Sequence, residues 1–323
     1  MGLNPNKIIM LSSKLKSYVV AGDIKRKALI KATSDAALRS SQIDDIRGDF
    51  KIDTILMGST GIGKSHWTTK SLNDANVNYV KIRGSVTFLT LCANLMLAHY
   101  HHLKDRTDES EKLVVFVDDC DTLFQTEEGR NALKEMSEKP GPDRKLSYNR
   151  IIQEHLLEPT HLEILENYKP KNGGSGFSVD CNDIIFIFAT NFALPTENEA
   201  NIYAKKNPAT PRANRLQSLA AIRRRFTCRD FILDRATNWG WLAHVTLTDK
   251  SLIESILGKK LYDIHKYEIL NWVWTNWETM TEHNLDTIKS LAYSVKEFGP
   301  DGYIDSWESE FINGDLLRES LIG

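Results

Sequence analysis

The residues best suited to chemistry in this chain form the segment GSTGIGKS, from Gly58 to Ser65. It matches the phosphate-binding pattern G-x-x-x-x-G-K-[ST] at every fixed position. In such a loop, backbone N–H groups point at phosphate oxygens from the positive end of a helix. We therefore expect Lys64 to contact the β and γ phosphates of ATP and Ser65 to bind Mg²⁺. The residues expected to bind the nucleotide are Gly58, Ser59, Thr60, Gly61, Ile62, Gly63, Lys64, Ser65 and His66.

Two adjacent aspartates follow a second apolar segment of the chain. The apolar run Leu113-Val-Val-Phe-Val117 is typical of a buried strand, and Asp118 and Asp119 come directly after it. We expect Asp118 to hold Mg²⁺, directly or through water, and Asp119 to polarise an attacking water as a general base. The alternative is a strand that simply ends in a polar loop. The phosphate-binding loop about sixty residues upstream favours the catalytic interpretation.

Other polar residues extend this pattern. Asn191 follows the apolar run 184–188, and at the end of a core strand it can hydrogen-bond the attacking water or the γ-phosphate.

His99 and His102 are three residues apart in a segment expected to be helical, so they share a face and could together bind a metal. No further metal ligand is evident for that pair in the sequence.

The elements that must position these residues are those of an α/β fold. Five apolar runs indicate buried strands of a parallel sheet, at 53–57, 78–82, 113–117, 184–188 and 228–233. Helices are expected at 28–38, 65–72, 86–103, 127–138 and 215–225, and towards the C-terminus at 250–257, 263–280 and 284–298.

The segment 140–182 is long for a connector and contains the glycine-rich run 172–177, which indicates a flexible hairpin or loop. Long segments of this kind inside a domain are usually functional. We expect an insertion that contacts a partner, a substrate or a neighbouring subunit.

Composition limits the possible function classes. The chain has 323 residues, of which 41% are hydrophobic and 26% charged, with a formal net charge of -2. The chain therefore lacks the net positive charge that would indicate nucleic-acid binding. The basic group formed by 25–27 and Lys31 is either a solvated helix face or a local contact to phosphate backbone or an acidic partner. The longest apolar stretch, 88–97, is too short to span a bilayer, so no membrane partner is expected. The sequence predicts a cytoplasmic protein with reduced, mostly buried thiols at Cys92, Cys120, Cys181 and Cys228.

The order of these motifs resembles that of the AAA+ ATPases, closely over about residues 45–235 and loosely beyond. VVFVDDCDTLF at 114–124 looks like the Walker B strand of that family and its D-E-x-D-A-L-F continuation, and ATN at 189–191 resembles its sensor 1. AAIRRRF at 220–226 is similar to the arginine-finger segment of the katanin and spastin type.

The resemblance implies a P-loop fold of AAA+ type, with a five-stranded parallel sheet flanked by helices. It implies a core at 1–235, which includes the N-terminal helical segment and the insertion at 140–182, and a small helical lid with a tail at 236–323. It also implies a homo-oligomer, a hexameric ring or spiral, in which Arg223 and Arg224, with Arg225 close behind, reach the ATP site of the next subunit. The alternative for the arginines is a basic helix end favoured by the helix dipole.

The sequence departs from the family pattern at three positions. The second acid is Asp119 where Glu is usual, which is similar to the bacterial replication-initiator and helicase-loader branch and predicts slow or neighbour-dependent hydrolysis. Asp286 stands where a sensor 2 arginine is expected, so that residue is absent or replaced by Lys289. The aromatic-glycine pore loop is missing, although Phe88 could play part of its role.

The resemblance implies an ATPase that handles DNA or a replication protein, like a helicase loader or clamp loader, in a bacterial cell or a phage-infected host. GKSHW at 63–67, which resembles the GKTHLA of helicase loaders, supports this interpretation. The alternatives are a protein-remodelling ATPase, which the AIRRRF segment supports, and an ATP-dependent assembly switch with slow turnover. A lone P-loop kinase is weaker, because it would not need the run of arginines.

Overall fold

The computed structural model of the chain describes residues 11–41, 52–83, 87–108, 110–171, 175–249, 251–280 and 282–312. In chain order its elements are α1 (Ser13–Ser41), β1 (Thr54–Gly58), α2 (Lys64–Asp74), β2 (Tyr79–Arg83), α3 (Phe88–Asp105), β3 (Leu113–Asp118), α4 (Asp121–Gln125), α5 (Glu127–Met136), β4 (Lys145–Tyr148), η2 (Glu154–Leu156), α6 (Pro159–Leu165), β5 (Phe177–Asp180), β6 (Ile184–Thr190), α7 (Glu197–Lys206), α8 (Pro211–Arg225), β7 (Thr227–Phe231), α9 (Arg235–Thr248), α10 (Ser251–Leu257), α11 (Lys259–Thr275) and α12 (Leu285–Phe311).

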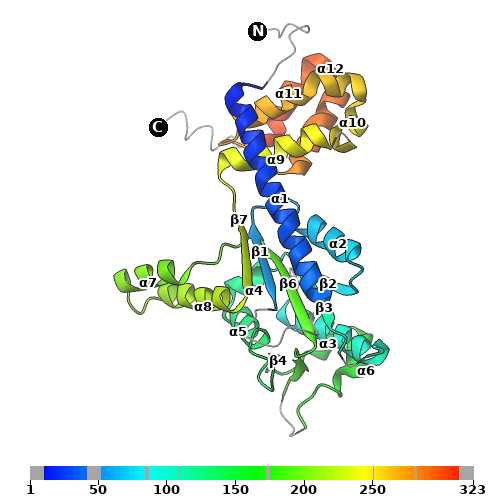
Figure 1. Ribbon diagram of the computed structural model, residues 1–323, viewed down its shortest axis with the longest axis vertical. Helices are drawn as coiled ribbons and strands as arrows, with labels where there is room; N and C mark the ends of the chain where they lie inside the picture. The colour runs from blue at the N-terminus through cyan, green and yellow to red at the C-terminus, as the bar shows by residue number, and fades with distance from the viewer. Residues whose placement is uncertain are drawn as a thin grey trace. The chain divides into compact units, whose positions relative to one another are not determined.

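The central sheet has five parallel strands in the order β2-β3-β6-β1-β7, flanked by helices (Figure 1). The predicted α/β class and the five predicted strands are confirmed, with bounds that shift by one or two residues. Strands β1, β3 and β6 are buried along their whole length. This explains their continuous apolar runs, because a parallel sheet covered on both faces has no solvent-facing side.

Strand order brings the polar motifs to one edge of the sheet. Strand β6 lies between β1 and β3, with Met57 opposite Thr190 and Val117 opposite Phe188. Because all five strands are parallel, their carboxyl ends lie at the same edge. Lys64 and Ser65 at the start of α2, the acids at and after the end of β3, and the asparagine after β6 therefore meet there.

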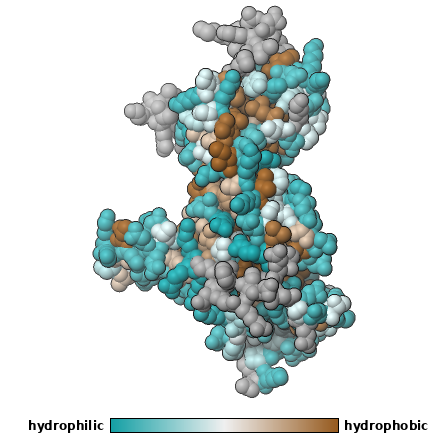
Figure 2. Space-filling view, viewed as in Figure 1, coloured by the Kyte–Doolittle hydropathy of each residue, from teal (hydrophilic) through white to brown (hydrophobic). Residues whose placement is uncertain are grey.

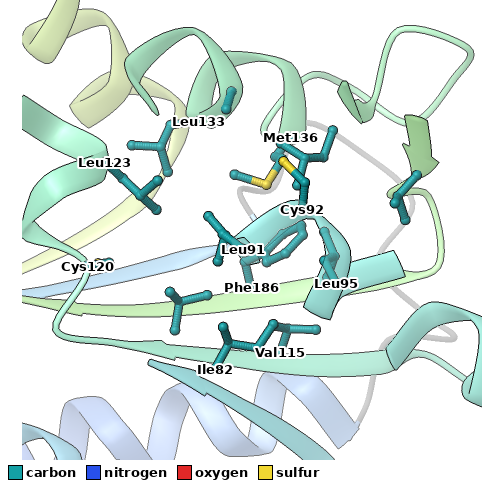
Figure 3. Close-up of a cluster of buried hydrophobic side chains, with 14 of the residues drawn as sticks. Ile82, Leu91, Cys92, Leu95, Val115, Cys120, Leu123, Leu133, Met136 and Phe186 are labelled. Atoms are coloured by element: carbon teal, nitrogen blue, oxygen red, sulfur yellow. The ribbon is translucent and has the colours of Figure 1, made fainter. Parts of the chain in front are cut away.

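Helices α3 and α5 cover part of the sheet through a dense apolar cluster. Figure 3 shows Cys92 and Leu95 of α3 and Met136 of α5 packed near Val115 and Phe186 of the sheet, and all five side chains are buried. The thiols follow the expectation from the sequence: Cys92, Cys120 and Cys181 are buried, Cys228 is half-buried, and all four are free.

Side-chain caps fix where several helices begin. Threonine at the N-cap accepts a hydrogen bond from the backbone N–H three residues later in α3, α5, α7 and α8, and Asp234 and Asn284 do the same for α9 and α12. Such caps satisfy backbone donors that the first helical turn leaves unpaired.

The segment 140–182 contains regular secondary structure. It contains the antiparallel pair β4–β5 and helix α6, and Leu146, Phe177 and Val179 belong to the main core. Residues 172–174 of the glycine-rich run lie outside the described residues. The predicted insertion is thus folded over these elements, and its contact with a partner stays a prediction.

Arg144 anchors this insertion to the start of β1. Its guanidinium is 4% exposed and lies 3.1 Å from the carboxylate of Asp53, and it donates to the backbone carbonyls of Cys181 and Ile184, each at 2.9 Å. A buried charge is stable only when it is paired and hydrogen-bonded, and these contacts provide both.

Several helices differ from the predicted ones. Helix α1 begins at Ser13, fifteen residues before the predicted start at Ala28. Helices α7 and α9 occupy segments for which no helix was predicted. Helical structure also resumes after Gly299, where φ is 67°, and continues to Phe311.

The chain divides into two units. One holds 11–29, 59–63 and 233–312 of the described residues, and the other holds 30–41, 52–58 and 64–232. The predicted division at residue 235 differs from these two units, because it assigned the whole N-terminal segment to the nucleotide-binding core. Leu11 and Leu15 instead belong to the apolar cluster of the C-terminal helices, which includes the buried Trp239 and Trp307.

A close helix crossing explains this grouping. A Cβ added to Gly22 of α1 would lie 2.2 Å from the backbone of Gly240 in α9, and a Cβ on Gly240 would lie 1.9 Å from the carbonyl oxygen of Tyr18. The two backbones touch because neither glycine has a side chain. Beside them His244 lies 3.2 Å from Asp23.

Candidate functional site

Lys64 is the first residue of α2, and its buried ammonium is held at the carboxyl edge of the sheet. Its Nζ donates to the carbonyl oxygen of Gly58 and to Oδ1 of Asn191, each at 2.8 Å. Burial lowers the pKa of Lys64 to about 8, and the negative charges of Asp119, Asp121 and Asp118 oppose the shift. The lysine is thus desolvated and surrounded by acids, an environment in which it interacts strongly with an anion.

The loop between β1 and α2 has the backbone that its glycines permit. Gly61 and Gly63 have φ values of 77° and 86°, in the left-handed region that favours glycine. A Cβ on Gly61 would also lie 2.5 Å from Cβ of Asn284, the N-cap of α12. Ser59 Oγ accepts a hydrogen bond from the backbone N–H of Leu233 at 3.4 Å.

The other residues expected to bind the nucleotide differ in exposure. Ile62 is buried, whereas Thr60 is exposed. His66 is exposed on α2, and its ring centroid lies 5.1 Å from that of Trp67. The Ile62 side chain therefore packs in the protein, and it can contribute to binding only through its backbone.

Asp118 and Ser65, the predicted metal ligands, are in direct contact. Ser65 Oγ donates to Oδ1 of Asp118 at 2.6 Å. The second carboxylate oxygen, Oδ2, lies 2.8 Å from Nζ of Lys81 on the neighbouring strand β2. Sequence reasoning did not identify Lys81, because no motif contains it and only the strand register brings it to Asp118.

These donors fit Mg²⁺. A hydroxyl and a carboxylate are hard oxygen ligands of the kind this ion prefers, and here they converge from the ends of two elements. Ser65 and Asp118 would hold the ion, whose charge would stabilise negative charge on the phosphates.

Asp119 has an unusual backbone conformation. Its φ is 54°, in the left-handed region where aspartate, asparagine and glycine are the best tolerated residues, and its side chain is exposed. Of the three acids whose charges act on Lys64, Asp119 has the largest effect. An exposed carboxylate whose charge acts on the buried lysine can accept a proton from a water molecule.

Asp121 fixes the asparagine at the end of β6. Its Oδ1 accepts from Thr190 Oγ1 at 2.5 Å and from the backbone N–H of Asn191 at 2.9 Å, and its Oδ2 lies 3.4 Å from Asn191 Nδ2. The sequence contained a signal for this residue, since Asp121 is the last acid of the DDCD run, but no role was assigned to it. Lys64, Asn191 and Asp121 therefore form one hydrogen-bonded chain.

The three arginines of α8 have different environments. Arg223 donates to the carbonyl oxygen of Leu194, and Arg225 donates to the carbonyl of Lys134 at 2.9 Å and forms an ion pair with Glu138. Arg224 is exposed, and the described residues include no hydrogen-bond or ion-pair partner for it. The structure thus separates two arginines with intramolecular contacts from one that faces solvent.

Arg224 lies in the last turn of α8, three residues before β7 begins at Thr227. Helices α7 and α8 project from the rest of their unit (Figure 1), and the face seen in Figure 2 is mostly hydrophilic there. A cavity of about 200 Å³ between the two helices includes Glu197 and Arg224 in its lining.

The two histidines proposed as a metal pair have separate partners. His99 Nδ1 lies 3.0 Å from the hydroxyl of Tyr168, and His102 Nε2 lies 3.1 Å from the carbonyl oxygen of Glu111. Within the described ranges no group of three or more histidine, cysteine, aspartate or glutamate side chains is placed to hold a metal ion. The shared metal site is not supported.

The sensor 2 position carries a local ion pair. Lys289 Nζ lies 2.8 Å from Asp286 on the first turns of α12, and both side chains are exposed. A contact between Lys289 and a phosphate stays a prediction.

A cavity of about 660 Å³ lies along β2 and one face of α3. Its lining includes Arg106 and Lys112, but both cations bind Asp183, at 3.2 and 2.6 Å. Lys81 lines the same cavity and also contacts Asp118. We place the candidate site at the sheet edge, where the predicted residues meet, and not in this cavity.

In the part of the chain that the structure describes, no helix has the length and apolar character needed to cross a membrane. The sequence matches no model of a known protein family, and no curated protein matches it either. The functional argument therefore depends on the residues and their geometry.

Proposed function

We propose that the chain is an ATPase of the AAA+ type that binds ATP with Mg²⁺ and hydrolyses it to ADP and phosphate. The observation that carries the proposal is the hydrogen-bonded chain Lys64–Asn191–Asp121, beside the contact between Ser65 and Asp118. The phosphate loop, the acids and the asparagine come from three separate strands. Their convergence is what phosphoryl transfer requires, because its catalysis consists mainly of positioning and charge stabilisation.

Each residue has a role in this scheme. Lys64 exchanges Gly58 and Asn191 for the β and γ phosphates. This frees Oδ1 of Asn191 to accept a hydrogen bond from the attacking water. Asp119 takes a proton from that water, and the water oxygen bonds to the γ-phosphorus. The bond between the γ-phosphorus and the bridging oxygen breaks, and that oxygen leaves with ADP.

The arginine that completes the site comes from a neighbouring copy in this proposal. Arg224 is the best candidate, since Arg223 and Arg225 have intramolecular contacts. A ring or spiral of copies, with six as the proposed number, would present it in trans. An arginine finger is worth about 10³–10⁵ in rate.

The proposed client is DNA or a replication protein. It is supported by Asp119 as the second acid and by the GKSHW segment, and it predicts that DNA or a replicative helicase stimulates ATP turnover. An assembly switch with slow turnover is the second candidate. The hydrogen bonds on both ends of the Asn191 amide favour it, because the amide must leave Lys64 before it can act on water.

The test of the enzymatic proposal compares ATP binding and phosphate release in three variants. Lys64→Ala should lose binding, and Asp119→Asn should bind ATP but release phosphate about 10²-fold more slowly. Lys70→Ala is the matched control, because Lys70 lies on the same helix and is exposed and paired with Asp74. A wild-type chain that does not bind ATP, or a Lys64→Ala variant that hydrolyses it normally, would contradict the proposal.

A further inference from the structure

Both carboxylate oxygens of Asp118 are occupied by neighbouring side chains. Ser65 Oγ contacts Oδ1 at 2.6 Å, and Lys81 Nζ contacts Oδ2 at 2.8 Å. The carboxylate is 9% exposed, so its charge needs a partner, and Lys81 provides one. A metal that displaces the Ser65 hydrogen bond gains access to Oδ1, whereas Lys81 still holds Oδ2.

Lys81 reaches Asp118 from the edge strand of the sheet. In the register of β2 and β3, Lys81 pairs with Phe116, and Arg83 pairs with Asp118. The Lys81 side chain must therefore extend along the sheet, and its ammonium lies 5.2 Å from the centroid of the Phe116 ring. An ordinary surface ion pair contributes little, but this pair has a buried carboxylate as one member.

We propose that Lys81 is a positioning residue that sets the metal preference of the site, an inference that rests on the function proposed above. By holding Oδ2, Lys81 restricts Asp118 to coordination through one oxygen. Mg²⁺ takes about six ligands in a strict octahedron, whereas Ca²⁺ takes about six to eight oxygens and commonly accepts both oxygens of a carboxylate. Lys81 thus disfavours Ca²⁺ more than Mg²⁺, and its charge weakens the binding of both ions.

The experiment measures equilibrium binding of a fluorescent ATP analogue while MgCl₂ or CaCl₂ is titrated. No turnover is needed, and the readout is the ratio of the Ca²⁺ to the Mg²⁺ concentration at half-saturation. In Lys81→Met this ratio should fall about tenfold, a change of the size that altering the partner of a metal ligand commonly produces. Both half-saturation concentrations should decrease, and that for Ca²⁺ should decrease more. Lys81→Arg, which retains the charge, should preserve the ratio.

Lys112→Met is the matched control, because Lys112 also pairs with an aspartate, Asp183, but at the opposite end of β3. A ratio in Lys81→Met that equals the wild-type ratio overturns the inference, and so does an equal change in Lys112→Met. Lys81→Gln gives a second measurement if the Met variant does not fold. If the wild-type chain binds the analogue but the ratio stays constant in the variants, the inference about Lys81 is refuted and the proposed function is not. Absence of wild-type binding with either metal refutes the proposed function as well.

Discussion

The side-chain oxygen of Asn191 lies 2.8 Å from the ammonium nitrogen of Lys64. The amide oxygen therefore accepts a hydrogen bond from the ammonium, so each group has a partner. A buried lysine without an acceptor would be costly, and the asparagine reduces that cost. The pair can separate when phosphate oxygens replace the amide as acceptor.

This contact predicts that Asn191→Ala separates binding from hydrolysis. The variant should bind ATP at least as tightly as the wild type, because Lys64 no longer has to leave the amide. Its phosphate release should fall about 10²-fold or more, as when a positioned hydrogen-bonding group is removed from an active site. Nucleotide titration and single-turnover phosphate release measure the two effects. A loss of binding with normal hydrolysis of the bound fraction would contradict the prediction.

Asp121→Ala should impair the same step through Asn191. It removes the acceptor of Thr190 and Asn191, so we expect about 1–3 kcal/mol of lost stability and slower phosphate release. Asp121→Asn keeps one carbonyl oxygen and should lose less. The double variant of Asp121 and Asn191 tests the coupling, because residues in one hydrogen-bond network give non-additive effects. Additive losses of activity would show that Asp121 acts independently of Asn191.

The arginines of α8 should separate into two classes. Arg224→Ala should leave the melting temperature unchanged but lower ATPase activity by about 10³-fold, and it should inhibit wild-type protein when the two are mixed. Arg225→Ala should destabilise the fold, because it breaks the contacts with Lys134 and Glu138. Specific activity across a dilution series checks the contribution in trans. Activity that is independent of concentration and insensitive to Arg224→Ala would exclude it.

His99 should make the fold sensitive to acid. Burial lowers the pKa of His99, which otherwise lies near 6.5. As pH falls below about 6.5, the unfolded chain takes up a proton that the folded chain rejects, so stability decreases by up to about 1.4 kcal/mol per pH unit. His99→Gln, which can still hydrogen-bond Tyr168, should flatten this dependence. Urea unfolding at pH 5 and pH 7.5 measures it, and equal pH slopes in the two proteins would refute the assignment.

The sheet and its polar edge could be predicted because their signals are local. Strands β1, β3 and β6 are continuous apolar runs, and the residues that follow each run must lie at the same edge of a parallel sheet. Helix α7 also had a local signal, the capping box of Thr196 and Glu199, but no helix was predicted there.

Other features depend on contacts between distant parts of the chain. Lys81 belongs to the site only because β2 pairs with β3 in one register, and β4 pairs with β5 across about thirty residues. The grouping of the first part of α1, up to Leu29, with the C-terminal helices depends on the crossing of Gly22 and Gly240, two glycines that carry no periodic signal. Sequence patterns contain no information on such pairings without an alignment of related chains.

The contacts of Arg144 have a consequence for engineering and for evolution of this chain. Excising the insertion would remove the guanidinium that pairs with the Asp53 carboxylate, which is 3% exposed in the intact chain, and leave that charge unpaired at the start of β1. Deletion of the insertion alone should therefore destabilise the chain. A viable shorter chain needs a second change at residue 53 in the same step, such as Asp53→Asn, so deletion and substitution should occur together or not at all.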